Sequence, residues 1–255
     1  LVSFVQAQIL TFHQTLAVIL GADVGTTVTA QLIAFKATDL GIAMVAAGFI
    51  LASFSKKQDL TNIGQVLFGL GLLFFGMKIV IDSMIPLRTY PQFTQLLYQL
   101  KNPILGILFA AIFTALIQSS AAFIGIVIVL AQQGMLDLSA GVPLILGSNI
   151  GTCIAAGIAS VKASKAARRV ALAHVGFKVA GVLLFVFWIP GFVELTKWVS
   201  APFSVDVARE IANAHTLFNV FLAIAFFPFI DRVAAFIERL LPDQPEKEQM
   251  GLLPK

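Results

Sequence analysis

Two long stretches of this chain carry no charged side chain. The first covers residues 103–136 and the second residues 138–161, so Asp137 holds the one charge between them. A helix needs about 20 predominantly apolar residues to cross a bilayer. Further apolar runs of similar length, with at most one charged residue each, lie at residues 62–81, 170–187 and 211–230. We therefore predict an all-α polytopic membrane protein.

Composition supports this class. Charged residues make up 12% of the chain and hydrophobic residues 58%, whereas an average soluble domain is about a quarter charged. The formal charge of +4 could point to nucleic acid, but the basic residues stand in short groups between the apolar runs, as topology signals do. We predict a multi-pass protein of the cell (plasma) membrane, with the lipid bilayer as a partner and no nucleic acid. The single cysteine, Cys153, excludes an internal disulfide.

The chain repeats itself at a spacing of 126 residues. Residues 20–27 (LGADVGTT) align with residues 146–153 (LGSNIGTC), and the same register pairs Gln6 with Gln132. Many secondary transporters consist of two copies of one membrane unit that face each other across a substrate site near the bilayer midplane. The predicted organisation is residues 1–55 as the remainder of a first repeat, 56–187 as a second repeat, 188–241 as a C-terminal span and helix, and 242–255 as a disordered tail.

Charge distribution predicts that the two copies have inverted topology. The loop after the second motif holds four basic residues and no acidic one, Lys162, Lys165, Arg168 and Arg169, so we assign it to the cytoplasm. In the first copy Lys36 is balanced by Asp39, which is expected on the opposite side. This arrangement requires one interrupted segment of the second copy to be re-entrant. By the repeat register, the equivalent of Gln118-Ser119-Ser120 would precede Leu1, and we expect part of the first half-site to lie outside this sequence.

Gln118, Ser119 and Ser120 interrupt the first charge-free stretch near its middle. Unsatisfied polar groups cost several kcal/mol in hydrocarbon and persist only when buried in protein or lining a watery cavity. An amide and two hydroxyls can donate to an oxyanion and accept toward an alkali cation. Alternatively, the serines bond back to their own helix and the glutamine joins neighbouring helices.

The aligned motifs place glycines four residues apart, at Gly21 and Gly25 and again at Gly147 and Gly151. We expect these glycines to break their helices in mid-membrane, which would free carbonyls for a cation and expose a helix N-terminus to an anion. Thr26, Thr27 and Thr152 would then lie in the first turn after each break. Alternatively, the glycines form a small-residue packing face, as we also expect for the glycine-rich run at residues 62–81.

Asp23 and Asn149 lie between the paired glycines. A carboxylate inside the membrane indicates a functional site by default. We interpret Asp23 as a cation ligand or coupling residue, with a structural partnership to a basic group as the alternative. A second internal echo, 41 residues apart, pairs residues 173–179 (AHVGFKV) with residues 214–220 (AHTLFNV). Its histidines, His174 and His215, could line an access path or instead bond backbone near helix ends.

Together, the Gln-Ser-Ser triplet and the two Gly-x-Asx-x-Gly-Thr motifs resemble the type II sodium/phosphate cotransporter family. The resemblance extends to about residue 229 and includes residues 69–77 (GLGLLFFGM). Several positions depart from the family pattern: Ala121 replaces a third serine, Asp23 stands where the family has Asn, Cys153 replaces a threonine, and Lys178 replaces an asparagine.

The resemblance implies opposed re-entrant hairpins and a sodium-coupled inorganic phosphate symporter working by alternating access, with the sodium gradient driving phosphate uptake. It implies phosphate binding by Gln118, Ser119, Ser120, Thr26 and Thr27, and sodium binding by Asp23, Ser119, Ser120, Asn149 and Thr152. Sodium is the coupling ion, no cofactor is expected, and the oligomeric state is left open.

Two rival functions were weighed against transport. A membrane receptor or complex subunit could bind an anion without moving it. An intramembrane hydrolase could use Ser119 or Ser120 with His174, but nothing resembling a nucleophile elbow with a positioned base occurs in the sequence. We therefore predict that the protein is not an enzyme.

Overall fold

The computed structural model describes residues 1–35, 37–203 and 206–242, and within these ranges all regular structure is helical. In chain order the α-helices are α1 (Val2–Gln6), α2 (Phe12–Ile33), α3 (Gly41–Phe54), α4 (Gln58–Met84), α5 (Pro91–Gln99), α6 (Pro103–Ile117), α7 (Ser120–Gln132), α8 (Leu138–Gly151), α9 (Cys153–Ser160), α10 (Lys165–Val186), α11 (Ile189–Ser200), α12 (Val207–Phe226) and α13 (Ile230–Leu240). Short 3-10 turns occupy Thr38–Leu40, Pro86–Thr89, Ala201–Phe203 and Phe227–Phe229. The predicted tail lies outside the described residues from residue 243 onward.

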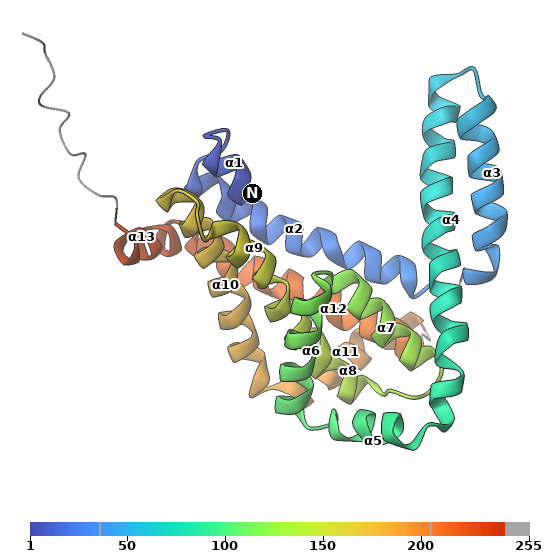
Figure 1. Cartoon of the computed structure of the whole chain (residues 1–255). Coiled ribbons are helices and arrows are strands. Elements are labelled where there is room, and N and C mark those ends of the chain that lie inside the picture. Colours follow the sequence, from blue (N-terminus) through green and yellow to red (C-terminus); the bar gives the residue numbers. More distant parts are fainter. Residues whose placement is uncertain (36, 204–205, 243–255) are drawn as a thin grey trace, which may run out of the picture.

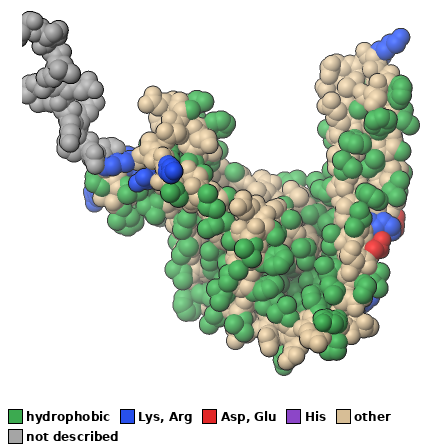
Figure 2. All heavy atoms as spheres, viewed as in Figure 1, with side chains coloured by type: hydrophobic (Ala, Val, Ile, Leu, Met, Phe, Trp, Pro, Cys, Tyr) green, Lys and Arg blue, Asp and Glu red, His purple; other side chains and the backbone are tan. Residues whose placement is uncertain are grey.

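Within the described residues, five helical runs are long and apolar enough to cross a membrane. They are Phe12–Ile33, Gln58–Thr89, Leu138–Ser160, Lys165–Val186 and Val207–Leu240. Large apolar side chains point outward over much of the surface (Figure 2), among them Phe54 at 75%, Leu116 at 77% and Phe187 at 89% exposed. Such a surface suits lipid rather than water. The prediction of an all-α polytopic membrane protein is confirmed.

The 126-residue repeat extends to local backbone structure. Helices α2 and α8 begin at equivalent positions, with Thr11 and Asp137 as the N-cap side chains that accept from backbone N–H groups. Just before them, Gln8 (φ 57°) and Gly134 (φ 71°) both adopt the left-handed conformation. The two copies therefore share helix starts and a turn. The inverted topology of the copies and the boundaries between the predicted repeats stay predictions.

The predicted helix breaks at the paired glycines are wrong. Helix α2 runs without interruption through Gly21 and Gly25, and α8 continues to Gly151. The next residue, Thr152, retains helical angles (φ −58°, ψ −28°) before α9 begins. A glycine costs a helix only about 1 kcal/mol relative to alanine, whereas backbone groups left without hydrogen bonds in an apolar layer cost several kcal/mol each. Thr26, Thr27 and Thr152 therefore do not follow a helix break as expected.

The break occurs instead at Gln118, as the polar triplet predicted. Gln118 ends α6 in the left-handed conformation (φ 53°), and Ser119 is extended before α7 begins. Helices α6 and α7 have 15 and 13 residues, so each is about 20 Å long, less than the roughly 30 Å of a bilayer core. A hairpin of two such helices has the dimensions of a re-entrant segment. Helix α5 meets α6 at 113°.

Helices α3 and α4 form a long hairpin that stands beside the main body (Figure 1). Its glycines bring the two backbones into contact: a Cβ atom on Gly48 would lie 2.3 Å from the Phe68 N atom, and one on Gly64 would lie 2.4 Å from the Ala52 N atom. Small residues allow this approach in membranes. The packing role expected for the glycine-rich run at residues 62–81 is thus confirmed at Gly64.

Helix α8 lies at the centre of the main core, in contact with α6, α7, α11 and α12 (Figure 1). A Cβ atom added to Gly147 would lie 2.1 Å from the Ile107 carbonyl oxygen, and one on Gly151 would lie 2.4 Å from the Ala111 oxygen. The equivalent glycines of α2, Gly21 and Gly25, have no such neighbour within 4 Å. The packing-face alternative is therefore correct for the second copy, while the same face of α2 is open.

The end of α13 docks on the first turns of α10. Arg169 donates two hydrogen bonds to the Leu241 carbonyl oxygen, at 3.0 and 2.7 Å, and the Lys165 Nζ atom donates to the Pro242 oxygen at 2.8 Å. Basic side chains gather at this end of the molecule (Figure 2). The cytoplasmic assignment of this end remains a prediction.

Candidate functional site

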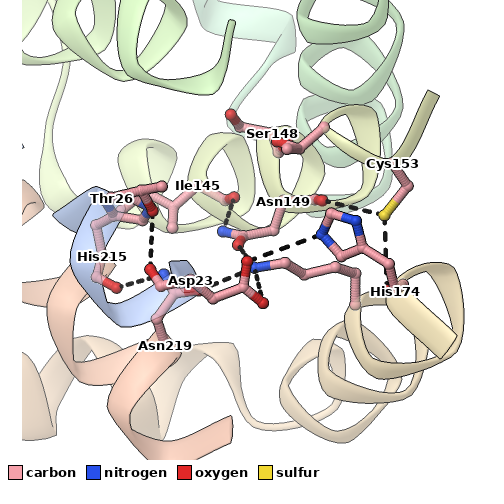
Figure 3. A network of polar contacts seen from close by, with 11 residues as sticks. Asp23, Thr26, Ile145, Ser148, Asn149, Cys153, His174, His215 and Asn219 are labelled. Atoms are coloured by element: carbon pink, nitrogen blue, oxygen red, sulfur yellow. Dashed lines mark hydrogen bonds and ion pairs between the residues drawn. The ribbon is translucent and has the colours of Figure 1, made fainter. Parts of the chain in front are cut away.

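The side chains of Asp23 in α2, Asn149 in α8 and Asn219 in α12 converge in one polar cluster (Figure 3). A buried lysine of α10, Lys178, contacts all three. The Lys178 Nζ atom lies 2.9 Å from the Asp23 Oδ2 atom. It donates hydrogen bonds to the Asn149 Oδ1 atom at 2.7 Å and to the Asn219 Oδ1 atom at 3.0 Å. Lys178 is only 2% exposed. Three helices thus direct one side-chain oxygen each at an ammonium supplied by a fourth.

The two asparagine oxygens are held in place by their own amide groups. The Asn149 Nδ2 atom donates to the Ile145 carbonyl oxygen at 2.9 Å, and the Asn219 Nδ2 atom donates to the His215 oxygen at 2.9 Å. Each side chain therefore bonds one turn back along its own helix. With the amide nitrogen engaged, the carboxamide oxygen is the group that faces Lys178.

Asp23 balances the charge of Lys178 inside the protein. An isolated buried charge is strongly destabilising, whereas a close opposite charge offsets part of the desolvation cost. The Asp23 Oδ2 atom is buried and lies 2.9 Å from the Lys178 Nζ atom as the acidic partner of an ion pair. The structural partnership with a basic group, which the sequence left open for Asp23, is the arrangement observed. Whether Asp23 also binds a metal cation stays a prediction.

Both histidines of the internal echo border this cluster. The His174 Nε2 atom lies 3.8 Å from the Asp23 Oδ1 atom, too far for a hydrogen bond. Within the described residues, the His174 Nε2 atom and the His215 Nδ1 atom are both buried and have no hydrogen-bond partner. The alternative that these histidines bond backbone near helix ends is wrong, because α10 begins at Lys165 and α12 at Val207, well before either ring.

The three threonines of the glycine motifs bond back into their own helices. The Thr26, Thr27 and Thr152 hydroxyls donate to backbone oxygens three or four residues earlier, at 2.8, 2.7 and 2.9 Å. Such bonds are common for hydroxyls inside helices. Each hydroxyl oxygen keeps acceptor capacity, so these side chains can still face a cation.

The Gln118-Ser119-Ser120 turn presents a helix N-terminus. The Ser119 side chain caps α7 by accepting a hydrogen bond from the Ala122 N–H group at 3.2 Å. The Gln118 side chain is exposed and makes no hydrogen bond within the described ranges. The first turn of a helix carries N–H groups without intrahelical partners and the positive end of the helix dipole. This turn is therefore suited to attract an anion.

The structure divides the predicted site residues into two groups. Asp23 and Asn149 meet at Lys178, whereas no hydrogen bond or ion pair among the described residues joins Gln118 to that cluster. A third contact links the groups indirectly: Thr114, in the last turn of α6, donates to the Ser148 hydroxyl at 3.2 Å. Ser148 directly precedes Asn149, so the hairpin tip and the cluster share α8 as a common support.

Sequence reasoning missed a second polar site at the other end of the α2–α12 contact. A cavity of about 400 Å³ is lined by Gln31, Val199, Phe203, Arg209, Asn213, Thr216 and Leu217. The Arg209 Nη1 atom donates to the Gln31 Oε1 atom at 3.3 Å, and the guanidinium lies 3.9 Å from the centre of the Phe35 ring. Within the described part of the chain, no carboxylate forms an ion pair with Arg209. The sequence offered one indication of this site, because Arg209 is a charged residue next to the apolar run at residues 211–230.

The family model described as Na+/Pi-cotransporter matches residues 1–82 and 87–189. The chain belongs to the Na+/Pi-cotransporter family. The resemblance inferred from the Gln-Ser-Ser and Gly-x-Asx-x-Gly-Thr motifs is thereby confirmed, and both motif regions lie inside the matched residues.

Relatives of this Na+/Pi-cotransporter family member come from bacteria and animals. The "Uncharacterized protein YqeW" of Bacillus subtilis is 35% identical over 245 residues, covering 94% of this chain and 77% of the relative. The "Putative inorganic phosphate export protein YjbB" of Escherichia coli O157:H7 is 28% identical, covering 96% of this chain but 44% of the relative, so the chain spans under half of that protein. The "Sodium-dependent phosphate transport protein 2A" of Ovis aries is 40% identical over 55 residues, 22% of this chain and 9% of the relative. No solved structure matches the chain.

Proposed function

We propose that this protein carries inorganic phosphate across the cell membrane together with sodium. The observation that carries the proposal is the polar helix break at Gln118 inside a charge-free stretch of a Na+/Pi-cotransporter family chain. Ser119 caps α7, but the exposed Gln118 amide, the Ser120 hydroxyl and the N-terminus of α7 have no such structural partner among the described residues. A transported oxyanion would use all of them.

Phosphate would bind at the first turn of α7. The Gln118 amide and the Ser119 and Ser120 hydroxyls donate hydrogen bonds to its oxygens there, and the α7 dipole favours its negative charge. Thr26 and Thr27 of α2 would complete the phosphate site from the other repeat. Their hydroxyls now donate to backbone, so they must rotate to reach the anion.

Sodium would bind at the hydroxyl lone pairs of Ser119, Ser120 and Thr152. The Asp23 and Asn149 oxygens, which the resemblance also assigns to sodium, face the Lys178 ammonium in this structure. A sodium ion next to phosphate offsets part of the free-energy cost of placing the anion in low-dielectric surroundings. Movement of one repeat against the other would expose the site to each side in turn.

The direction of net transport follows from the gradients in this scheme. Transport of phosphate with sodium is reversible in principle, so an inward sodium gradient drives uptake and a high internal phosphate concentration drives release. The name of the Escherichia coli relative includes the word export, and a reversible coupled step in this chain would permit net movement of phosphate in either direction.

Labelled phosphate flux in proteoliposomes tests the proposal. The full-length protein is reconstituted and loaded with sodium or choline salts at equal ionic strength, and flux is measured in both directions. We expect flux that rises with a sodium gradient and falls at least about tenfold in the Ser119→Ala/Ser120→Ala double variant. Ser83→Ala, on an exposed part of α4, is the matched control. No flux under any gradient would overturn the proposal, and phosphate binding without flux would favour an anion-binding receptor or complex subunit instead.

A further inference from the structure

The Lys178 cluster unites the two internal repeats of the sequence. Asp23 and Asn149 are equivalent in the 126-residue repeat, and Lys178 and Asn219 are equivalent in the 41-residue echo. In the structure the side-chain oxygens of Asp23, Asn149 and Asn219 all point at the Lys178 Nζ atom. Each pair therefore consists of one neutral asparagine and one charged residue, and the two charges are opposite.

Each N–H group of the Lys178 ammonium has one oxygen atom to face. The ammonium has three N–H donors and no acceptor, and three oxygen atoms lie between 2.7 and 3.0 Å from it. Those oxygens come from three different helices. The amide nitrogens of Asn149 and Asn219 point away from Lys178 and donate to backbone oxygens. An oxygen shell of this kind, with one carboxylate, is what a hard metal cation uses in proteins.

We propose that Lys178 permanently occupies a monovalent cation site formed by Asp23, Asn149 and Asn219, so that this chain binds no metal ion at that site. The consequence for coupling rests on the proposed function: sodium would be carried with phosphate only at the hydroxyl groups around Ser119 and Ser120. If the lysine side chain were removed, a small monovalent cation would take its place, and sodium is the probe for this.

A purely structural ion pair differs from this arrangement in one measurable respect. If Lys178 only neutralises Asp23, its removal leaves a damaged site with no selectivity for any ion. If Lys178 stands in for a cation, the remaining oxygens bind sodium when the ammonium is removed. The two cases separate in a binding measurement that does not depend on transport.

Lys178→Ala is the test variant, because alanine leaves the three oxygens and frees the space of the ammonium. The wild type, Lys178→Ala and Asp23→Asn/Lys178→Ala are purified in high sodium and exchanged into choline chloride. Sodium-22 binding and thermal unfolding are then measured as sodium replaces choline at constant ionic strength. Comparison with the wild type subtracts any sodium bound elsewhere.

We expect Lys178→Ala to bind additional sodium saturably. At sodium ten times above its Kd, binding to the native state raises the folding equilibrium constant about tenfold. The added site should weaken strongly in Asp23→Asn/Lys178→Ala, which lacks the carboxylate. A folded Lys178→Ala protein that binds no more sodium than the wild type would overturn the proposal, even if phosphate transport is demonstrated.

Asp23→Asn/Lys178→Asn provides a second measurement if Lys178→Ala does not fold. It gives each charged residue the side chain of its repeat partner, so no net charge is buried and four carboxamide oxygens surround the space. We expect this variant to fold and to bind sodium more weakly than Lys178→Ala would. If neither variant folds in high sodium, the proposal is overturned, because the ion was available to take the place of the ammonium. Absence of phosphate flux alongside added sodium binding would remove the proposed function and leave this inference intact.

Discussion

Asp23 of α2 and Lys178 of α10 form an ion pair of 2.9 Å with both side chains almost fully buried. The two residues are the charged members of their respective repeat pairs, and each is a departure from the pattern of the family that the sequence resembles. The structure shows that the two departures compensate each other. A change at either position alone should therefore behave differently from a change at both.

Asp23→Asn should destabilise the protein by about 3–5 kcal/mol, because it leaves the Lys178 charge buried without a counter-charge. Asp23→Asn/Lys178→Asn should recover most of that loss. Denaturant or thermal unfolding in detergent, arranged as a double-mutant cycle, measures the coupling. The control is Asp39→Asn, which breaks the exposed 3.2 Å pair with Lys78 and should have far less effect, because exposed ion pairs contribute little to stability. Equal costs for Asp23→Asn and Asp39→Asn would contradict the buried pairing.

Gly147→Ala should be far more damaging than Gly21→Ala, although the two glycines are equivalent in the repeat. The added Cβ atom would lie 2.1 Å from the Ile107 oxygen at Gly147 but would meet open space at Gly21. Overpacking of this kind costs about 1–3 kcal/mol, whereas an unhindered alanine in a helix gains up to about 1 kcal/mol. Unfolding midpoints of the two variants test this difference. Similar destabilisation by both would mean that another segment packs against Gly21.

Gln118→Gly should stabilise the α6–α7 turn while lowering phosphate transport. Gln118 has a φ of 53°, a conformation that glycine adopts at little cost, and relief of this strain is worth about 1 kcal/mol. Gln118→Ala keeps the strain and also removes the amide. We expect both variants to lose phosphate flux and only Gln118→Gly to raise the unfolding midpoint. Unchanged flux in both would exclude the amide from the phosphate site.

Arg209→Gln should raise the KM for phosphate by about tenfold with little change in kcat. The guanidinium faces a cavity of about 400 Å³ without a carboxylate partner in the described ranges, and a positive potential in a cleft raises the local anion concentration. Arg209→Lys should retain most of the affinity. Arg232→Gln, whose guanidinium lies 5.4 Å from the centre of the Phe229 ring, is the control. A KM independent of the charge at residue 209 would show that the cavity does not lie on the phosphate path.

Sequence patterns predicted the features that depend on local chemistry. The apolar runs at residues 62–81, 138–161, 170–187 and 211–230 each fall almost entirely in a helical run long enough to cross a membrane. The polar triplet marked the helix break at Gln118. The glycine motifs misled because a glycine pair permits either a break or close helix packing. The choice depends on what lies against the helix, and in the second copy that neighbour is α6.

Features that depend on tertiary packing could not be read from the sequence. Lys178 and Asp23 were both noted as departures, but their contact requires α10 to lie beside α2. Arg209 lies in the first turn of α12, a position with no distinctive sequence pattern. Its cavity forms where residues of α2, α11 and α12 come together. Local patterns carry no information on such meetings.

The pairing of Asp23 with Lys178 also bears on how the membrane voltage acts on the protein. Each elementary charge moved across the full membrane is worth about 2.3 kcal/mol per 100 mV. A carboxylate and an ammonium that travel together carry no net charge through that field. As long as the two side chains move together, the electric field does no net work on carrying this cluster across the membrane, whereas a cycle that separated them would become sensitive to voltage.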